Sequence, residues 1–134
     1  MKKYIGIKEV KAQPMTAEEA LKKGYRVGDN KGDGYEVEYT DGYKSWSPKK
    51  AFEAAYQVAA SPLDRMEIEK KELEVRLHKL EAVLLQDAID GIKKYGSVQY
   101  LLMREQRSYM RHYYTALCSR ITNLQLSQKS AKEL

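Results

Sequence analysis

The sequence has little of the residue types that support disulfide, metal or hydrolytic chemistry. Its 134 residues include one cysteine, Cys118, which excludes an internal disulfide framework and a paired-cysteine zinc site. The two histidines, His78 and His112, do not form the HExxH pattern of zinc hydrolases, and so few histidines disfavour Ser-His-Asp catalysis. These absences point away from an enzyme and predict no bound metal or cofactor.

Long hydrophobic runs are also absent. No stretch approaches the roughly 18 apolar residues that a membrane span needs. The first twenty residues have a basic start but no continuous apolar core, so we expect no signal peptide. With 43% apolar and 32% charged residues, the chain is predicted to be soluble, and its length suits one domain or two very small modules.

The charge is unevenly distributed along the chain. The net charge is +5 overall. Residues 62–84 have a net charge of −1, whereas residues 93–126 carry six Lys or Arg and a single acidic residue, for a net charge of +5. The last third of the chain is therefore predicted to carry the surface that attracts anions.

The first 60 residues have the signals of several short strands. β-Branched and aromatic residues predict strands at 3–10, 25–27, 35–39 and 43–46, and Asp41-Gly42 is typical of a hairpin turn between the last two. Glycine-rich residues 29–34 resemble half of an EF-hand loop, but two ligand positions hold Lys31 and Thr40, so a surface loop is the better interpretation.

Two short helices are predicted in the same region. Thr16 and Glu19 form a capping-box pattern before a helix at residues 17–23. Ser47 followed by proline predicts the start of a helix that runs to about residue 59.

Residues 61–126 are predicted to form an antiparallel hairpin of two long helices. Ser61, Pro62 and Asp64 have the pattern of a helix start, and residues 88–96 are the expected connection to a second helix at 97–126. In the first helix a heptad row at spacings of three and four contains Leu63, Met66, Leu73, Leu77, Leu80 and Leu84, and only Lys70 interrupts it. The corresponding row in the second helix contains Met103, Gln106, Met110, Tyr113, Leu117, Arg120 and Leu124.

The expected architecture is α+β. A small N-terminal antiparallel β-sheet module with short helices (1–60) precedes a long antiparallel helical hairpin (61–126) and a polar, frayed tail (127–134). Further apolar rows on the two helices cannot all be buried within one hairpin, so we expect a homo-oligomer.

Arginines and tyrosines are concentrated in the second long helix. Arg104, Arg107 and Arg111 are spaced to share one face, and Tyr109, Tyr113 and Tyr114 interleave with them. Guanidinium groups bind phosphate bidentately and tyrosine rings stack on bases, so the pattern suits a nucleotide-like anion. It equally suits a solvated basic face with tyrosines in the core or in an oligomer contact. Three arginines are too few for strong duplex binding.

The hairpin sequence is similar to that of a known group of phage proteins. SPLDRMEIEKKELEVRLHKLEAVL followed by LLMREQRSYMRHYYTALCSRI resembles the helical hairpin shared by anti-CBASS sponge proteins and the first type of Thoeris anti-defence protein. YIGIKEVKAQPMT and GYEVEYTDGYKSWSPKKAFEAAY resemble the N-terminal module of those Thoeris anti-defence proteins. The resemblance covers nearly the whole chain.

The resemblance implies a non-enzymatic sponge in the cytoplasm of an infected bacterial host. Such proteins bind the cyclic ADP-ribose isomers made by TIR-domain enzymes, and some also hold the cyclic di- or trinucleotides of CBASS. They form dimers or hexamers with pockets between protomers. Val83 here corresponds to an aromatic residue that stacks on the ligand, and Arg107 and Arg111 correspond to arginines that contact phosphates. Arg104, Tyr109 and Tyr113 complete the expected ligand-binding set.

A second function remains open at this point. The basic hairpin could serve a phage accessory protein that binds nucleic acid without sequence specificity, or a protein partner. Salt-sensitive gel shifts would distinguish nucleic-acid binding from capture of a cyclic nucleotide.

Overall fold

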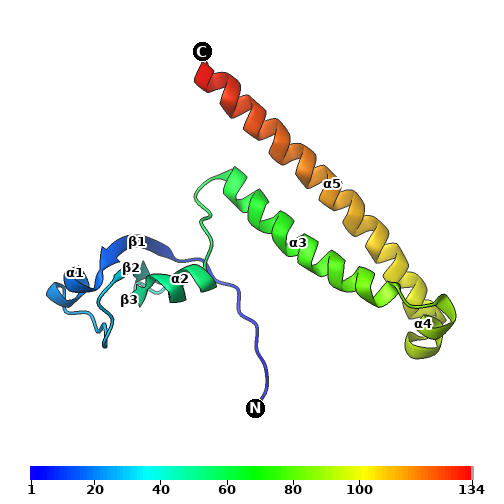
Figure 1. Cartoon of the computed structure of the whole chain (residues 1–134), viewed down its shortest axis with the longest axis horizontal. Helices are drawn as coiled ribbons and strands as arrows, with labels where there is room; N and C mark the ends of the chain where they lie inside the picture. The colour runs from blue at the N-terminus through cyan, green and yellow to red at the C-terminus, as the bar shows by residue number, and fades with distance from the viewer. Residues whose placement is uncertain (134) are drawn as a thin grey trace. The chain divides into compact units, whose positions relative to one another are not determined.

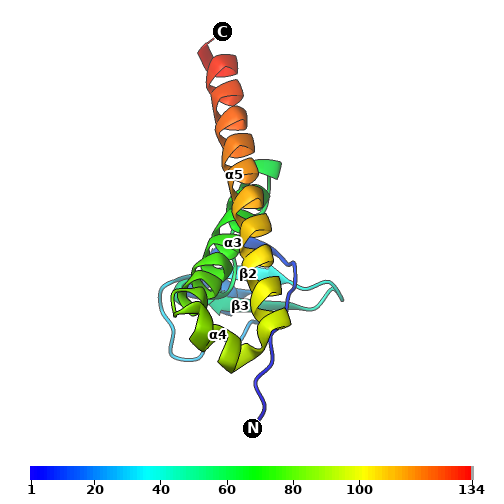
Figure 2. The ribbon, with the colours of Figure 1, turned by 90° about the vertical axis from the view of Figure 1, so that its right-hand side faces the viewer.

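The computed structural model describes residues 1–133, which form two compact units, one over Met1–Gln57 and one that begins at Val58 (Figures 1 and 2). The first, the N-terminal unit, holds a three-stranded antiparallel sheet and two short helices. The second, the helical unit, holds three helices. The predicted α+β class is confirmed.

The sheet has the order β1-β2-β3 and is antiparallel throughout. Its strands are β1 (Lys11–Thr16), β2 (Asp33–Glu38) and β3 (Lys44–Pro48). The prediction of a first strand at residues 3–10 is wrong, because β1 begins only at Lys11, where pairing with Glu38 of β2 starts. The strand expected at 25–27 is also wrong, because the Tyr25 amide bonds to the Ala20 carbonyl and closes the preceding helix instead.

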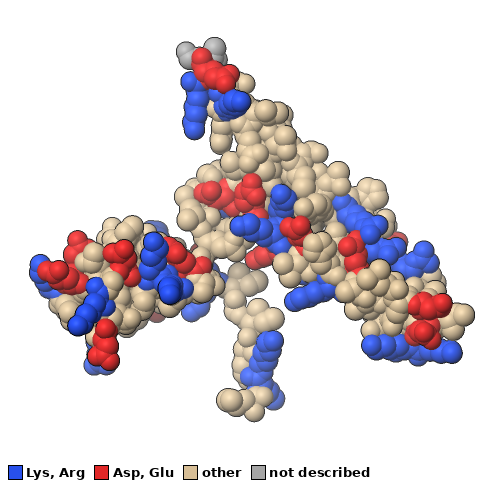
Figure 3. All heavy atoms as spheres, in the orientation of Figure 1, with Lys and Arg blue, Asp and Glu red and all other residues tan. Residues whose placement is uncertain are grey.

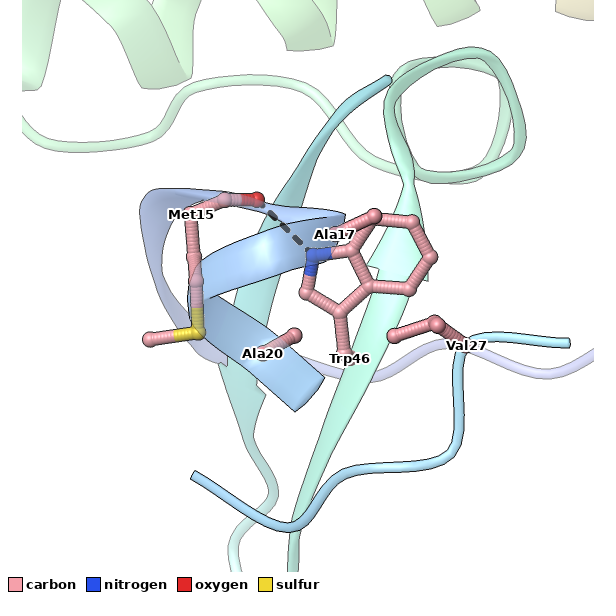
Figure 4. Close-up of a cluster of buried hydrophobic side chains, with 5 residues drawn as sticks. All are labelled: Met15, Ala17, Ala20, Val27 and Trp46. Atoms are coloured by element: carbon pink, nitrogen blue, oxygen red, sulfur yellow. Dashed lines mark hydrogen bonds between the residues drawn. The ribbon is translucent and has the colours of Figure 1, made fainter. Parts of the chain in front are cut away.

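The core of the N-terminal unit lies between the sheet and α1 (Ala17–Lys22). The predicted capping box of Thr16 and Glu19 is present at the start of α1. Figure 4 shows the indole of Trp46 reaching from β3 toward Met15, and its Nε1 donates a hydrogen bond of 2.8 Å to the Met15 carbonyl. The buried cluster contains Met15, Ala17, Ala20, Val27 and Trp46.

The helix α2 (Lys49–Ala55) begins later and ends earlier than predicted. The prediction that Ser47 caps it is wrong, because Ser47 lies within β3 and pairs with Tyr35 of β2. Pro48 occupies the N-cap position without a side-chain hydrogen bond. Phe52 of α2 stacks on Tyr35 with ring centroids 4.4 Å apart, which holds the helix against the sheet.

The helical unit is a hairpin of α3 (Pro62–Leu84) and α5 (Ser97–Glu133), which lie side by side in Figures 1 and 2. Ser61 and Asp64 form the capping box that starts α3, as the sequence predicts. The helix α5 extends through residues 127–133, beyond the end predicted at residue 126, so the expected frayed tail is helical as far as Glu133.

The connection between the long helices contains a helix that the sequence analysis missed, α4 (Ala88–Tyr95). Asp87 caps its start by accepting a hydrogen bond from the Ile89 amide. Gly91 lies on the inner side of α4 against the ring of Tyr100, where a Cβ atom would overlap the ring. Gly96 has a φ of +83°, which separates α4 from α5.

The row of α5 residues that packs on α3 differs from the predicted row at every second member. At each of these places the less exposed residue is the one that follows the predicted residue in the sequence. The least exposed residues of this face are Tyr100, Met103, Arg107, Met110, Tyr114, Leu117, Ile121 and Leu124. The predicted row shares Met103, Met110, Leu117 and Leu124 with it but is wrong for three members that are exposed: Gln106, Tyr113 and Arg120. Packing against α3 buries the apolar groups of Tyr114 and Ile121 in their place.

Candidate functional site

A second apolar row runs along α5, beside the row that packs on α3. It contains Leu102, Tyr109 and Tyr113, which are exposed in the chain by itself. At about 100° per residue this row is centred about a quarter of a turn away from the α3-facing row. Tyr113 is 43% exposed, so its ring is available to a ligand or to another chain.

Two adjoining hollows lie along this row. The first has a volume of about 410 Å³ and lies over α5 alone, lined by Leu102, Glu105, Gln106, Tyr109, Met110 and Tyr113. The second has a volume of about 470 Å³ and lies between α3 and α5, lined by Leu73, Arg76, Lys79, Leu80, Gln106, Met110 and Tyr113. Because they share Gln106, Met110 and Tyr113, we treat them as one surface feature and call it the basic groove.

The floor and the edges of the basic groove have different chemistry. Leu73, Leu80 and Met110 form an apolar floor, while Arg76 and Lys79 of α3 supply two cationic side chains. The Nε of Arg76 donates a hydrogen bond of 3.3 Å to the Glu72 carbonyl. An apolar floor beside two cations suits a ligand that combines a flat ring with a phosphate.

The outer part of the groove is polar at its rim. The Tyr109 hydroxyl donates a hydrogen bond of 3.1 Å to the Glu105 carboxylate, one turn earlier on α5. This hydrogen bond raises the pKa of Tyr109 above its ordinary value, so its hydroxyl stays protonated and remains a donor at neutral pH.

The three arginines of α5 that were predicted to bind ligand, Arg104, Arg107 and Arg111, do not line the basic groove. Arg111 forms an ion pair with Glu81 of α3, and its Nε donates a hydrogen bond of 2.7 Å to the Glu81 Oε1. Arg107 is half-buried in the α3-facing row, and Arg104 is exposed. Arg104 and Tyr113 are nine residues apart, so their side chains leave the helix in nearly opposite directions, about half a turn apart. Within one chain, α5 therefore presents the arginines and the groove tyrosines on different sides.

Val83 lies half-buried near the end of α3 and lines neither hollow. Of the six residues predicted to bind ligand, the structure brings Tyr109 and Tyr113 together in the groove and leaves Val83, Arg104, Arg107 and Arg111 outside it.

The sequence analysis missed Arg76 and Lys79 as candidate ligand-binding residues. They lie in residues 62–84, whose net charge is negative, so the search for cationic segments passed over them. Their positions in the sequence could have indicated them, because Arg76 and Lys79 each lie within four residues of Leu73 or Leu80 and so beside the leucine row of α3. On the hairpin face seen in Figure 3, Lys and Arg side chains are interspersed with Asp and Glu rather than gathered in one patch.

Other polar side chains of α5 have local roles. The Nδ1 of His112 lies 2.8 Å from the Ser108 carbonyl, one turn earlier, and Cys118 is half-buried.

Within residues 1–133 no group of three or more His, Cys, Asp or Glu side chains is placed to hold a metal ion. Over the same residues, none of the helices has the length and hydrophobicity required to cross a bilayer.

The hairpin is also the part of the chain that matches a known family. Residues 60–123 match the Sequestin family model. This Sequestin segment is just under half of the chain. No curated protein and no solved structure matches the chain.

The Sequestin segment contains α3, α4 and most of α5, and therefore every residue that lines the basic groove. The family name describes sequestration rather than catalysis, which fits a sequestering protein. The N-terminal unit lies outside the match.

Proposed function

We propose that this protein is a phage anti-defence sponge that binds a cyclic nucleotide signal and holds it without degrading it. The proposed ligands are the cyclic ADP-ribose isomers made by TIR-domain enzymes of Thoeris, with the cyclic di- or trinucleotides of CBASS as a second class. Its place of action is the cytoplasm of the infected host. The observation that carries the proposal is the basic groove of the Sequestin segment, where Arg76 and Lys79 lie beside an apolar floor and Tyr113.

The groove supplies the interactions that such a ligand needs. A guanidinium and an ammonium group bind phosphate oxygens. The ring of Tyr113 and the apolar floor can contact the face of an adenine, and stacking on an aromatic ring is worth about 1–3 kcal/mol. The one hydroxyl–carboxylate pair described in the groove is Tyr109 with Glu105, and because that hydrogen bond raises the pKa of Tyr109 it does not activate the hydroxyl as a nucleophile, so we assign the groove binding alone.

Ligand affinity cannot come from charge alone. A nanomolar dissociation constant corresponds to about 12 kcal/mol. Charge-assisted hydrogen bonds contribute about 1.5–3 kcal/mol each, so one such bond from each of the two cations supplies at most about half of that free energy. The remainder requires burial of the base, and an open groove on one chain leaves part of a ligand in water.

A second copy of the chain is proposed to close the groove. The side chains of Leu102, Tyr109 and Tyr113 are exposed in a single chain, and contact with another chain would remove them from water. The proposed partner is another hairpin in a dimer or a hexamer. Such packing would bring Arg104 and Arg111 of one chain toward the tyrosines of the next. Arg111 can exchange its carboxylate for a phosphate, because an exposed ion pair is worth at most about 1 kcal/mol.

Calorimetry with a panel of cyclic ADP-ribose isomers and cyclic oligonucleotides tests the proposal. Replacing Arg76 and Lys79 together with alanine should weaken binding about a hundredfold or more, since two charge-assisted contacts are worth about 3 kcal/mol at least. The matched control replaces Lys129 and Lys132, two cations at the far end of α5, and should bind as the unmodified chain does.

The fate of the ligand separates sequestration from other activities. After binding in the cold, heating the complex should release ligand of unchanged mass by mass spectrometry. Ligand of altered mass would indicate an enzyme. Failure to bind any member of the panel, together with a salt-sensitive gel shift of DNA or RNA, would replace the proposal with the nucleic-acid-binding alternative.

A further inference from the structure

The first ten residues form an extended arm in front of β1. In Figure 1 they run away from the start of β1 to the N-terminus. Ile5 is 91% exposed and Ile7 is 99% exposed, and no strand of the described chain pairs with either. Two isoleucines in water and a row of unpaired backbone groups are a template for a further strand.

The sequence of the arm has the alternation of a strand on either side of Gly6. Lys3, Ile5, Ile7 and Glu9 alternate onto one face, so an apolar pair lies between a cation and an anion. At the end nearest the sheet, the Lys8 Nζ lies 5.5 Å from the centroid of the Tyr39 ring. This contact holds the arm beside the turn between β2 and β3 and leaves residues 1–7 beyond the sheet.

The arm is complementary to itself when two copies run antiparallel with Gly6 opposite Gly6. Ile5 then lies opposite Ile7, and Lys3 lies opposite Glu9. Because the pairing is two-fold symmetric, each of these pairs occurs twice. Opposite charges and β-branched residues at directly opposite positions stabilise an antiparallel pair.

Neighbouring registers lose either charge complementarity or the isoleucine pair. Shifting one arm by a single residue in one direction places Lys2 opposite Lys11. In the other direction Lys3 lies opposite Lys8 while Lys2 lies opposite Glu9, so the charges balance, but Ile5 then faces Gly6 instead of Ile7. Shifting it by two residues places Lys2 opposite Lys8, or Lys3 opposite Lys11. Like charges directly opposite each other destabilise strand pairing. The register centred on Gly6 avoids all four of these lysine pairs.

We propose that the arm is an interaction surface for a second copy of this chain, with which it forms a two-stranded antiparallel ribbon centred on Gly6. This ribbon would link N-terminal units, which lie outside the Sequestin segment. The interaction is independent of the basic groove, so it can stand or fall separately from the proposed ligand binding.

Disulfide trapping in the full chain tests the ribbon. In a background with Cys118→Ser, the variant Gly6→Cys places two cysteines directly opposite each other, within the Cα separation that a disulfide spans. In the control Lys2→Cys, the two cysteines would lie eight residues apart along the ribbon, or about 27 Å. Under mild oxidation, Gly6→Cys should give a covalent dimer at least about tenfold faster than Lys2→Cys.

Charge reversal then tests the register with the same readout. Adding Lys3→Glu or Glu9→Lys to Gly6→Cys should slow cross-linking about tenfold, because two attractive pairs become repulsive. Combining the two reversals restores opposite charges and should restore the rate.

Equal rates for Gly6→Cys and Lys2→Cys would show random collisions of the arms and overturn the proposal. Failure of the combined reversal to recover the rate would overturn it as well. Calorimetric ligand affinity should be the same in all these variants, so a failure of the ribbon is distinguishable from a failure of the groove.

Discussion

Truncating Leu117 to alanine should destabilise the helical unit more than any change on the outer faces of α5. Leu117 is 1% exposed and packs with Met66, Leu73 and Ile121. The substitution removes three carbon atoms. At about 0.8 kcal/mol for each buried methylene, the lost transfer free energy is about 2.4 kcal/mol, and the cavity left behind raises the total to about 3–4 kcal/mol.

Urea denaturation followed by far-UV circular dichroism measures this loss, because most helical residues belong to α3 and α5. With a denaturant slope of about 1.5 kcal/mol per molar, the midpoint should fall by about 2 M. Leu126→Ala is the matched control, since Leu126 is on the same helix and 59% exposed. Its free energy of unfolding should change by less than about 0.5 kcal/mol.

Two results would refute the reasoning about Leu117. One is a loss below about 1 kcal/mol, which is smaller than the transfer free energy of the removed atoms. The other is an equal loss from Leu126→Ala, which would mean that the buried face of α5 is not the one containing Leu117.

Three further predictions concern local features. Ser61→Ala removes a capping-box acceptor of α3 and should lower the free energy of unfolding by about 1 kcal/mol in thermal melts; an unchanged melting temperature would contradict the cap. Gly91→Ala should destabilise by about 1–3 kcal/mol in urea despite the better helix propensity of alanine, because its Cβ would overlap the Tyr100 ring; a stabilised variant would show that α4 packs differently. Hydrogen bonding from Tyr25 lowers the pKa of Glu36, so ionised Glu36 stabilises the folded state at neutral pH and this contribution should fade as the pH drops below about 4.5. In acid titrations monitored by Trp46 fluorescence, Glu36→Gln should show a weaker pH dependence below that value, and an identical acid transition would exclude Glu36 as its source.

Features that depend on neighbouring residues were predictable from the sequence. The capping boxes of Thr16 and Ser61 each join a side chain to an amide three residues later, so the pattern is complete within four residues. The α+β class and the helical hairpin followed from local periodicity in the same way. The helix α4 escaped because it is short and contains Gly91, whose role is set by contact with α5 rather than by propensity.

Strand positions depended on partners that the sequence does not specify. Residues 3–10 have the composition of a strand, yet no neighbour in the described chain pairs with them, and β1 begins where Glu38 becomes available at Lys11. Ser47 has the local pattern of a helix cap, but the hydrogen-bonded ladder with Tyr35 extends β3 past it. In both places the tertiary pairing overrode the local signal.

The sequence by itself determined that the seam of α5 contains Met103, Met110, Leu117 and Leu124, because the predicted row and the buried row share these four residues. Only packing against α3 decided which row is buried. It buried Tyr114 and Ile121, left Tyr113 facing a groove, and directed Arg111 toward Glu81. The side of α5 that carries Tyr113 does not carry Arg104, because the two residues lie about half a turn apart on the helix. The cations beside the groove therefore come from α3, as Arg76 and Lys79.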